Sequence, residues 1–400
     1  MSQELFILGG ARTPMAEYAG TPGYGKFKDL SAIELGAHAS RAALERTGVA
    51  PERIDHAIFG NALQTSSDAI YGARHVALKA GVPQEKPALT VNRLCGSGIQ
   101  SVIEAAHLLL LDEANIVLAG GMENMSQAPH VVRGGRTGFK FGMPINFEDL
   151  LFESLKDPYC GFFMAQTAEN LAKKYEIPRQ AQDEYALRSH RLGTAAVQEG
   201  RFADEIAPVT VKMGRKELVV DTDDHIKPDT SIEALSSLRP AFGKDGTVTA
   251  GNASGIVDGA AALVVTTQAQ LDADKSLKPS ARIVSWSVEG VPPEIMGIGP
   301  APAIRSAVKK AGLTLNDIDL FEINEAFSAQ YLACEKDLEL DRDKVNVNGG
   351  AIGIGHPLGA TGTRLLLTLM MQLQRSGKRY GCASACIGGG QGIAMIIERV

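Results

Sequence analysis

The sequence predicts an α/β protein made of two related halves, with a further segment inserted between them. A helix, a glycine, a polar loop and an apolar strand at residues 41–59 recur without a gap at 305–323. On either side of the middle, apolar runs typical of buried strands alternate with stretches of helical periodicity, which favours helices on both faces of buried sheets. The middle is instead rich in charge, glycine and short polar turns.

The first half opens with an apolar strand at 5–10. The helix in the first copy of the repeat is expected to end at Gly48, because glycine readily adopts the left-handed conformation of a C-cap. Apolar residues over 99–110 have the spacing of an amphipathic helix. A buried strand follows at 116–121, where the apolar run ends in two glycines.

We assign residues 122–246 to a loop domain inserted at the rim of the first half. Within it the pattern predicts one helix over 167–174 and another over 179–197. Small residues from 247 onward lead to an expected strand at 262–266, which would return the chain to the first half.

The first half therefore comprises residues 1–121, completed by about 247–270. The second half comprises 271–400 and opens with an apolar strand at 283–288. A chain of 400 residues exceeds what one hydrophobic core usually supports, which agrees with this division.

The composition favours a protein that acts on small molecules. A formal net charge of −6, without runs of like charge, argues against a nucleic-acid or membrane partner. Five cysteines, an odd number, are typical of reduced thiols in a cytosol-like compartment. The N-terminus has neither a signal-peptide core nor the look of an organelle presequence, so a cytoplasmic location is expected.

Three reactive side chains each lie in a glycine-dense cassette: Cys95, His356 and Cys386. Cys95 falls at or just before a helix N-terminus, where backbone N–H groups and the helix dipole favour a thiolate and can bind an oxyanion. His356 is expected in a strand-to-helix loop, where its imidazole can take the thiol proton. Cys386 ends a strand and begins a triple-glycine turn.

Structural roles remain open for each of these residues. Cys95 could be a small buried hydrophobe, and His356 could serve packing alone. Cys382 and Cys386 lie four residues apart, but no second close Cys/His pair completes a zinc site, so no metal is predicted. Two thiols and a histidine favour a mechanism with a separate role for each thiol, in which one sulfur carries an acyl group and the other moves a proton. Hydrolysis would need only one thiol.

Five blocks resemble the signature sequences of the thiolase family in order and spacing. They are NRLCGSG at 92–98, NEAF at 324–327, NVNGGA at 346–351, GHPLGATG at 355–362 and CIGGG at 386–390. The resemblance covers essentially the whole chain. It implies the thiolase fold, an α/β architecture of two duplicated halves with mixed sheets in helix and sheet layers, plus a loop domain covering the site. It also implies a homodimer or homotetramer, and coenzyme A (CoA) as substrate and product, with no separate cofactor.

The resemblance implies a role for each residue of the centre. Cys95 would accept the acyl group, and His356 would activate it. Cys386 would move the α-proton of the second thioester, while Asn324 would hold a water that, with His356, binds the enolate oxygen. The N–H groups of Cys95 and Gly388 would form the other oxyanion hole. Contacts to CoA would come from Ser254 and Lys227, with Met164, Phe242, Ala250, Met296 and Phe327 lining the pantetheine tunnel.

The expected activity is that of an acetyl-CoA C-acyltransferase, most simply acetyl-CoA C-acetyltransferase. It would convert two acetyl-CoA to acetoacetyl-CoA and CoA, or cleave 3-oxoacyl-CoA by thiolysis. One departure matters: acetoacetyl-CoA thiolases typically carry a histidine before the loop-domain methionine, where this chain has Phe163. A degradative 3-ketoacyl-CoA thiolase with broader chain preference is therefore the alternative.

Other classes stay open. A decarboxylating condensing enzyme usually has histidine or asparagine at the position of Cys386. A non-catalytic CoA- or lipid-binding module would tolerate decay of the site, whereas Cys95, Asn324, His356 and Cys386 are all present. A thiol redox sensor would form a disulfide between Cys95 and Cys386.

Overall fold

The computed structural model describes residues 3–400. Its main feature is a ten-stranded mixed sheet in the order β14-β15-β16-β13-β1-β12-β5-β3-β4, with β2 beside β12. The strands of the first half are β1 (Leu5–Arg12), β2 (Ala16–Glu17), β3 (His56–Gly60), β4 (Ala88–Val91), β5 (Ile116–Glu123) and β12 (Val257–Thr267). Those of the second are β13 (Ala281–Gly290), β14 (Leu320–Ile323), β15 (Tyr380–Ile387) and β16 (Gln391–Arg399).

The two halves share one continuous sheet, where the sequence predicted a sheet in each. β1 and β13 pair antiparallel over a short register that includes Leu5 opposite Ile283. The sheet is mixed, as expected, because β3 runs parallel to β4 and β5, and β14 parallel to β15, while the other pairs are antiparallel. β12 pairs with β1 and β5, so the chain does return to the first half after the inserted segment.

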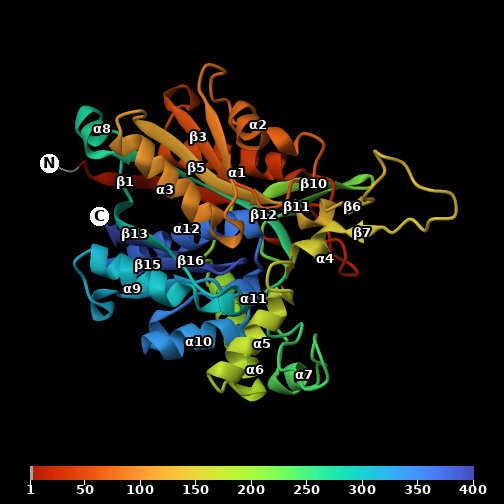
Figure 1. Cartoon of the computed structure of the whole chain (residues 1–400). Helices are drawn as coiled ribbons and strands as arrows, with labels where there is room; N and C mark the ends of the chain where they lie inside the picture. Colours follow the sequence, from red (N-terminus) through yellow and green to blue (C-terminus); the bar gives the residue numbers. More distant parts are fainter. Residues whose placement is uncertain (1–2) are drawn as a thin grey trace.

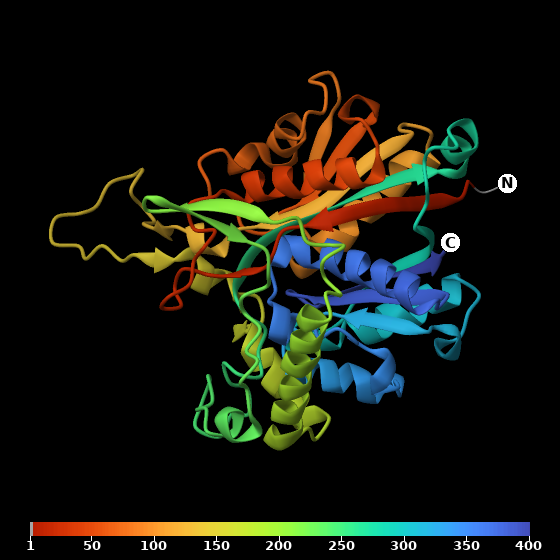
Figure 2. The same ribbon diagram turned by 180° about the vertical axis from the view of Figure 1, so that it is seen from behind.

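Helices form the layers around this sheet (Figures 1 and 2). α1 (Ala32–Thr47) and α2 (Gly72–Lys79) cover the outer face of the first half, and α9 (Pro300–Lys310) and α10 (Ser328–Leu338) lie on the outer side of the second. α3 (Ser97–Leu110) and α12 (Leu358–Ser376) share a buried apolar cluster with strands of both halves. Both helices therefore pack between the two halves.

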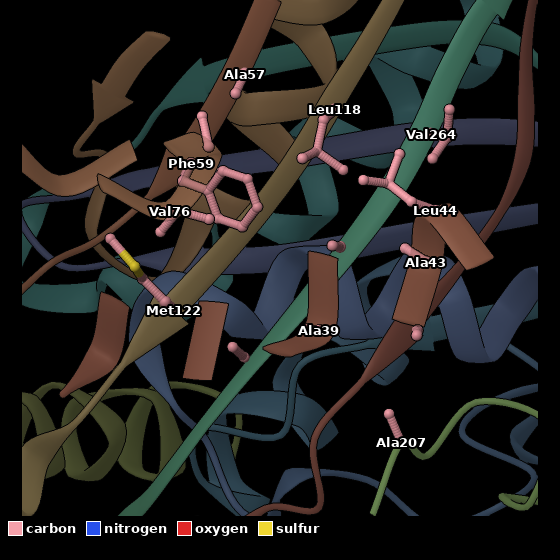
Figure 3. Packing of buried hydrophobic residues seen from close by; sticks show 14 of the residues in the cluster. Ala39, Ala43, Leu44, Ala57, Phe59, Val76, Leu118, Met122, Ala207 and Val264 are labelled. Carbon is pink, nitrogen blue, oxygen red and sulfur yellow. The ribbon is translucent and has the colours of Figure 1, made fainter. Parts of the chain in front are cut away.

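The internal repeat is present in the structure. α1 and β3 correspond to α9 and β14, and the glycines between them, Gly48 and Gly312, have φ of 67° and 70°. A capping box between Ser31 and Glu34 starts α1. Figure 3 shows why α1 is amphipathic: its Ala39, Ala43 and Leu44 face the core side chains of the adjoining strands. The strand residues labelled there are Ala57, Phe59, Leu118, Met122 and Val264.

The inserted segment contains four helices and three short hairpins. The helices are α4 (Leu150–Ser154), α5 (Met164–Lys174), α6 (Arg179–Gln198) and α7 (Ile232–Ser236). The hairpins pair β6 (His130–Val131) with β7 (Glu148–Asp149), β8 (Lys156–Asp157) with β9 (Phe162–Phe163), and β10 (Val209–Met213) with β11 (Lys216–Val220). The two helices predicted from periodicity are α5 and α6, although α5 begins three residues before the predicted start at 167.

Much of the inserted segment's apolar surface is buried against the two halves. Leu171 of α5 and Tyr185 of α6 belong to the cluster beneath α9 and α10, whereas Val209 and Val211 of β10 belong to the cluster beneath α1. The boundaries near residues 121, 246 and 270 thus remain a prediction about domain organisation.

The last helices are α8 (Gln268–Ala273) and α11 (Ala351–Ile354). Among residues 3–400, no helix is long and apolar enough to span a membrane.

Candidate active site

Cys95 lies in a 3₁₀ turn, η3 (Leu94–Gly96), which runs directly into α3. Leu94 has a positive φ of 47°, so the chain turns sharply before the thiol. The hydroxyl of Ser97 stabilises the turn: it accepts from Arg93 N at 2.8 Å and donates to Leu94 O at 2.7 Å. The position at the start of the helix agrees with the sequence prediction, and the side chain is partly exposed.

The electrostatics of Cys95 differ from the expectation of a lowered pKa. Burial raises the pKa of the Cys95 thiol to about 11, although the N–H groups of Gly388 and of Cys95 itself act to lower it. The negative charge of Glu123 raises it further. At this site desolvation outweighs the helix terminus, so Cys95 is a thiol near neutral pH and needs a base to become nucleophilic.

His356 lies between two helices, α11 and α12, and not in the strand-to-helix loop that was predicted. Gly355 gives the sharp turn before it, with φ of 105°. His356 N donates to Gly255 O at 2.9 Å, which fixes the backbone against the chain leading into β12. Burial, together with the charge of Arg364, lowers the pKa of His356 to about 3, so its imidazole is neutral and able to accept a proton.

Both ring nitrogens of His356 have a polar neighbour. Nδ1 lies 2.6 Å from Thr361 Oγ1, and Nε2 lies 3.3 Å from Asn324 Nδ2. Asn324 follows β14 and donates its backbone N–H to Ser384 O at 2.9 Å, which holds it beside β15. Its Oδ1 is buried and has no partner among residues 3–400, so an acceptor is free for a small polar molecule.

Cys386 lies near the end of β15, one strand from Asn324, and is fully buried. Its neighbours are apolar: Met296 and Ala326, with Met164 and Phe327 at the edge of the cluster. Burial raises the pKa of Cys386 well above its usual value, and Cys95 and then Cys334 add to this effect. Met164 also lines the cavities beside Cys95 and His356 that are described next, so Cys386 lies directly behind a wall that both cavities share.

Two adjacent cavities reach these groups. A cavity of about 280 Å³ is lined by Cys95 and Gly388, and one of about 190 Å³ is lined by His356 and Ser254. They share the walls Leu155, Met164 and Leu358. The thiol and the imidazole thus face one apolar, partly enclosed space, which is the usual form of a small-molecule site.

The residues predicted to contact CoA divide into two groups. Met164, Phe242, Ser254 and Phe327 line the cavity beside His356. Ala250 and Met296 line neither cavity: Ala250 is exposed, and Met296 is buried against Cys386. Their assignment to the walls of a pantetheine tunnel remains a prediction.

Lys227 lines neither cavity either, and its partly exposed side chain is paired within the protein. Its Nζ contacts Glu17 Oε2 at 3.0 Å and Tyr24 Oη at 2.7 Å, so it is engaged within the protein. Two residues near the site were missed by sequence reasoning. Thr361 lay within a quoted block without a role, and nothing in the sequence indicated that Glu123 accepts from Leu63 N and Gly359 N. Phe163, which the sequence had singled out, lines the cavity beside His356.

In this duplicated α/β fold a thiol and a neutral imidazole line adjoining apolar cavities, with an amide bonded to the imidazole and a second thiol behind a shared wall. This arrangement defines a thiol enzyme of the acyl-transferring class. Family models give the same result. The model described as thiolase, N-terminal domain, matches residues 5–269, and thiolase, C-terminal domain, matches 277–399.

Individual relatives of this chain are named as members of the same family. Human mitochondrial 3-ketoacyl-CoA thiolase is 51% identical over 396 residues, covering 98% of each chain. An acetyl-CoA acetyltransferase of Syntrophomonas wolfei is 44% identical over 402 residues, covering 100% of each. A crystal structure of the human enzyme with CoA superposes with a TM-score of 0.95 at 50% identity, covering 100% of this chain and 98% of that one. The chain belongs to the thiolase family, and it is an acyltransferase.

Proposed function

We propose that this thiolase transfers acyl groups between CoA thioesters through an acyl-Cys95 intermediate. It would cleave 3-oxoacyl-CoA with CoA, or condense two acetyl-CoA to acetoacetyl-CoA and CoA. The observation that carries the proposal is that Cys95 and His356 line adjoining cavities, and that Met164, a wall of both, packs against Cys386. CoA is substrate and product, as in the relative solved with CoA.

In thiolysis, the Cys95 thiol gives its proton to His356 and its sulfur attacks the 3-oxo carbon. The N–H groups of Cys95 and Gly388 stabilise the oxyanion. The C2–C3 bond then breaks, leaving the acyl group on Cys95 and an acetyl-CoA carbanion that takes a proton from Cys386. Asn324, through a water, and His356 stabilise the enolate oxygen; the unpartnered Asn324 Oδ1 supports such a water.

In the second half, the CoA thiol gives a proton to Cys386 and its sulfur attacks the acyl carbon. Cys95 leaves as a thiolate and recovers its proton from His356. Each residue returns to its starting state, so the cycle needs no metal, oxidant or reductant. Condensation is the reverse, with Cys386 removing the α-proton.

Trapping the intermediate tests this assignment. Cys386→Ala should still be acetylated at Cys95 by acetyl-CoA, seen as a mass increase on the Cys95 peptide, but should lose carbon–carbon bond chemistry. Wild type should show ping-pong kinetics with 3-oxoacyl-CoA and CoA. Full activity in Cys95→Ala would eliminate the proposal. A CoA-binding module would bind CoA without acetylation, and a redox sensor would instead form a Cys95–Cys386 disulfide with peroxide.

The substrate is proposed to include acetoacetyl-CoA and longer 3-oxoacyl-CoA. Phe163 stacks on Phe242 with ring centroids 5.2 Å apart and contacts Phe152 at 4.8 Å, and all three rings line the His356 cavity. An apolar wall favours an alkyl chain over a hydrogen bond to a short acyl group. Thiolysis rates from acetoacetyl-CoA to long-chain 3-oxoacyl-CoA test this. A rate confined to acetoacetyl-CoA would favour acetyl-CoA C-acetyltransferase, the narrower activity.

A homodimer or homotetramer is proposed for the assembly. The connection between β6 and β7 forms the long arm that projects from the body in Figure 1. It exposes large apolar side chains: Phe139, Phe141, Met143, Ile145 and Phe147. Such exposure favours burial against another copy. Light scattering after chromatography gives the mass, which should fall when Phe141 and Phe147 are replaced by serine; a monomeric wild type would contradict the proposal.

A cytoplasmic location also remains a proposal, and the human relative is named as mitochondrial. Fractionation of cells that express the full chain with a C-terminal tag tests it. Recovery in the cytosol supports the proposal, and recovery in an organelle contradicts it.

A further inference from the structure

A buried carboxylate, Glu123, lies beside the site and has no part in the steps above. It ends β5 and is 0% exposed. Its Oε1 accepts from Asn61 Nδ2 at 2.9 Å and Leu63 N at 3.0 Å. Its Oε2 accepts from Ala62 N at 3.0 Å and Gly359 N at 2.8 Å. Four donors on one buried side chain favour its ionised form, because a protonated oxygen would direct its own hydrogen toward a donor.

These bonds connect the cassettes of the two halves. Gly359 is three residues after His356, at the start of α12. The loop 61–63 follows β3 and contacts the Cys95 cassette, since Asn92 Nδ2 donates to Ala62 O at 3.2 Å and Asn92 Oδ1 accepts from Leu94 N at 2.9 Å. Glu123 therefore bonds to the segment carrying His356 and to a loop that contacts the segment carrying Cys95.

The packing leaves little other support at this junction. A Cβ on Gly359 would lie 2.8 Å from Met122 O and 2.9 Å from Gly60 O, so backbone meets backbone with no side chain between. The N–H groups of Ala62, Leu63 and Gly359 all donate to the Glu123 carboxylate, and none of them donates to a backbone carbonyl among residues 3–400. The carboxylate provides the acceptors that let this polar backbone be buried.

We propose that Glu123 is a positioning residue that fixes His356 relative to Cys95. The inference rests on the proposed function. The titratable groups around Glu123 are Asp258 on the neighbouring β12, Cys95, and His356. His356 lies at the other end of the short segment 356–359, whose Gly359 N–H donates to Glu123. Burial raises the pKa of Glu123 to about 7, the N–H groups of Leu63, Gly359 and Ala62 act to lower it, and Asp258 raises it further.

Glu123→Gln tests the inference, because it keeps the shape but turns one acceptor into a donor facing N–H groups. We expect kcat to fall by about 100-fold, the cost of misplacing a catalytic group by about 1 Å, while KM changes by less than about threefold. A second readout needs no turnover. Alkylation of Cys95 by iodoacetamide should reach half its maximal rate at a lower pH, because a negative charge near the sulfur has been removed.

Asp258→Asn is the matched control. Asp258 is also a buried carboxylate, on the strand next to Glu123, but it bonds to Ser126 and to neither 61–63 nor Gly359. Its kcat should stay within about threefold of wild type, within the usual effect of removing one modest interaction. Equal losses in both variants, an unchanged kcat in Glu123→Gln, or a KM that rises as kcat falls would overturn the inference.

If Glu123→Gln does not fold, Glu123→Asp replaces it. It keeps the charge but is one carbon shorter, so kcat should fall while the alkylation midpoint stays at the wild-type pH; wild-type kcat would overturn the inference. Failure of the proposed function itself is distinguishable. Wild type would then show no thiolysis, while the alkylation profiles would still report on Glu123.

Discussion

The Nδ1 of His356 lies 2.6 Å from the hydroxyl of Thr361, and that hydroxyl lies 3.0 Å from Pro357 O, to which it donates. With the hydroxyl hydrogen used on the carbonyl, Thr361 must accept from Nδ1–H. Nε2 is then the unprotonated nitrogen. Its lone pair accepts from Asn324 Nδ2 in this structure and would take the Cys95 proton when that bond is released. One threonine thus selects the tautomer on which the proposed chemistry depends.

Thr361→Val should lower kcat by about 100-fold, near the lower end of what a positioned general base contributes. Valine has nearly the same shape but removes the acceptor, so both tautomers become accessible. Thr361→Ser keeps the hydroxyl and should retain most of the activity in thiolysis assays. If the serine variant is as slow as the valine variant, packing of the methyl group and not the tautomer is responsible.

The reactivity of Cys95 should rise steeply with pH. Since its pKa is raised to about 11, the free enzyme holds a thiol at pH 7, and alkylation by iodoacetamide should increase through pH 9 and 10. The measurement is the rate of modification of the Cys95 peptide by mass spectrometry, with Cys160 of the same chain, which is partly exposed, as an internal reference. A rate that is already flat at pH 7 would mean that the helix terminus does dominate.

His356 should make the protein sensitive to acid. Its folded pKa, lowered to about 3, lies below the value of 6.5 for a free histidine. The unfolded chain therefore binds a proton that the folded one rejects, so stability present above pH 6.5 is lost as the pH falls toward 3. Between pH 7 and pH 5 this loss is about 2 kcal/mol. Urea unfolding of His356→Asn should show a smaller loss over the same range, and an equal loss would contradict the assignment.

Local patterns predicted much of the fold. The predictions that failed concern burial and contacts between residues far apart in the chain. The repeat, the amphipathic helix after Cys95 and the two long helices of the inserted segment follow from short-range spacing, and all are present. The region before His356 has the β-branched pattern of a strand, yet Asn346 has φ of 48° and Gly349 has φ of 80°. The side chain of Asn346 bonds to the N–H and C=O of Ile323 and so replaces the ladder of a strand.

The remaining misses depend on burial, which no local pattern records. The pKa of Cys95 was predicted to be lowered by the helix terminus together with a base, whereas burial raises it. The pairing of β1 with β13 and the four donors around Glu123 likewise join residues far apart in the chain. In sequence, Glu123 resembles any other carboxylate at the end of a strand.

Exchange of one aromatic side chain should change the chain-length preference. Phe163→His places an imidazole in the apolar wall formed with Phe152 and Phe242. It should raise kcat/KM for acetoacetyl-CoA relative to a 3-oxoacyl-CoA of eight or more carbons by about 10-fold, the effect of a good polar contact in a pocket. Phe163→Leu keeps the wall apolar and should leave the ratio near wild type. An unchanged ratio in the histidine variant would show that Phe163 does not face the acyl chain.

A buried ion pair beneath the site gives the strongest prediction for stability. Arg364 Nη1 lies 3.0 Å from Glu322 Oε2 with both side chains buried, and Arg364 Nε and Nη2 have no partner within residues 3–400. Burial raises the pKa of Glu322 to about 8 although Arg364 opposes this, so the pair is fully charged only above pH 8. Above that pH, Glu322→Gln leaves the guanidinium uncompensated, and the free energy of unfolding should fall by about 3–5 kcal/mol. Replacing both residues, as Glu322→Gln with Arg364→Met, removes the unpaired charge and should restore much of that loss in urea unfolding. A double variant no more stable than Glu322→Gln would mean that packing around Arg364, and not its charge, sets the cost.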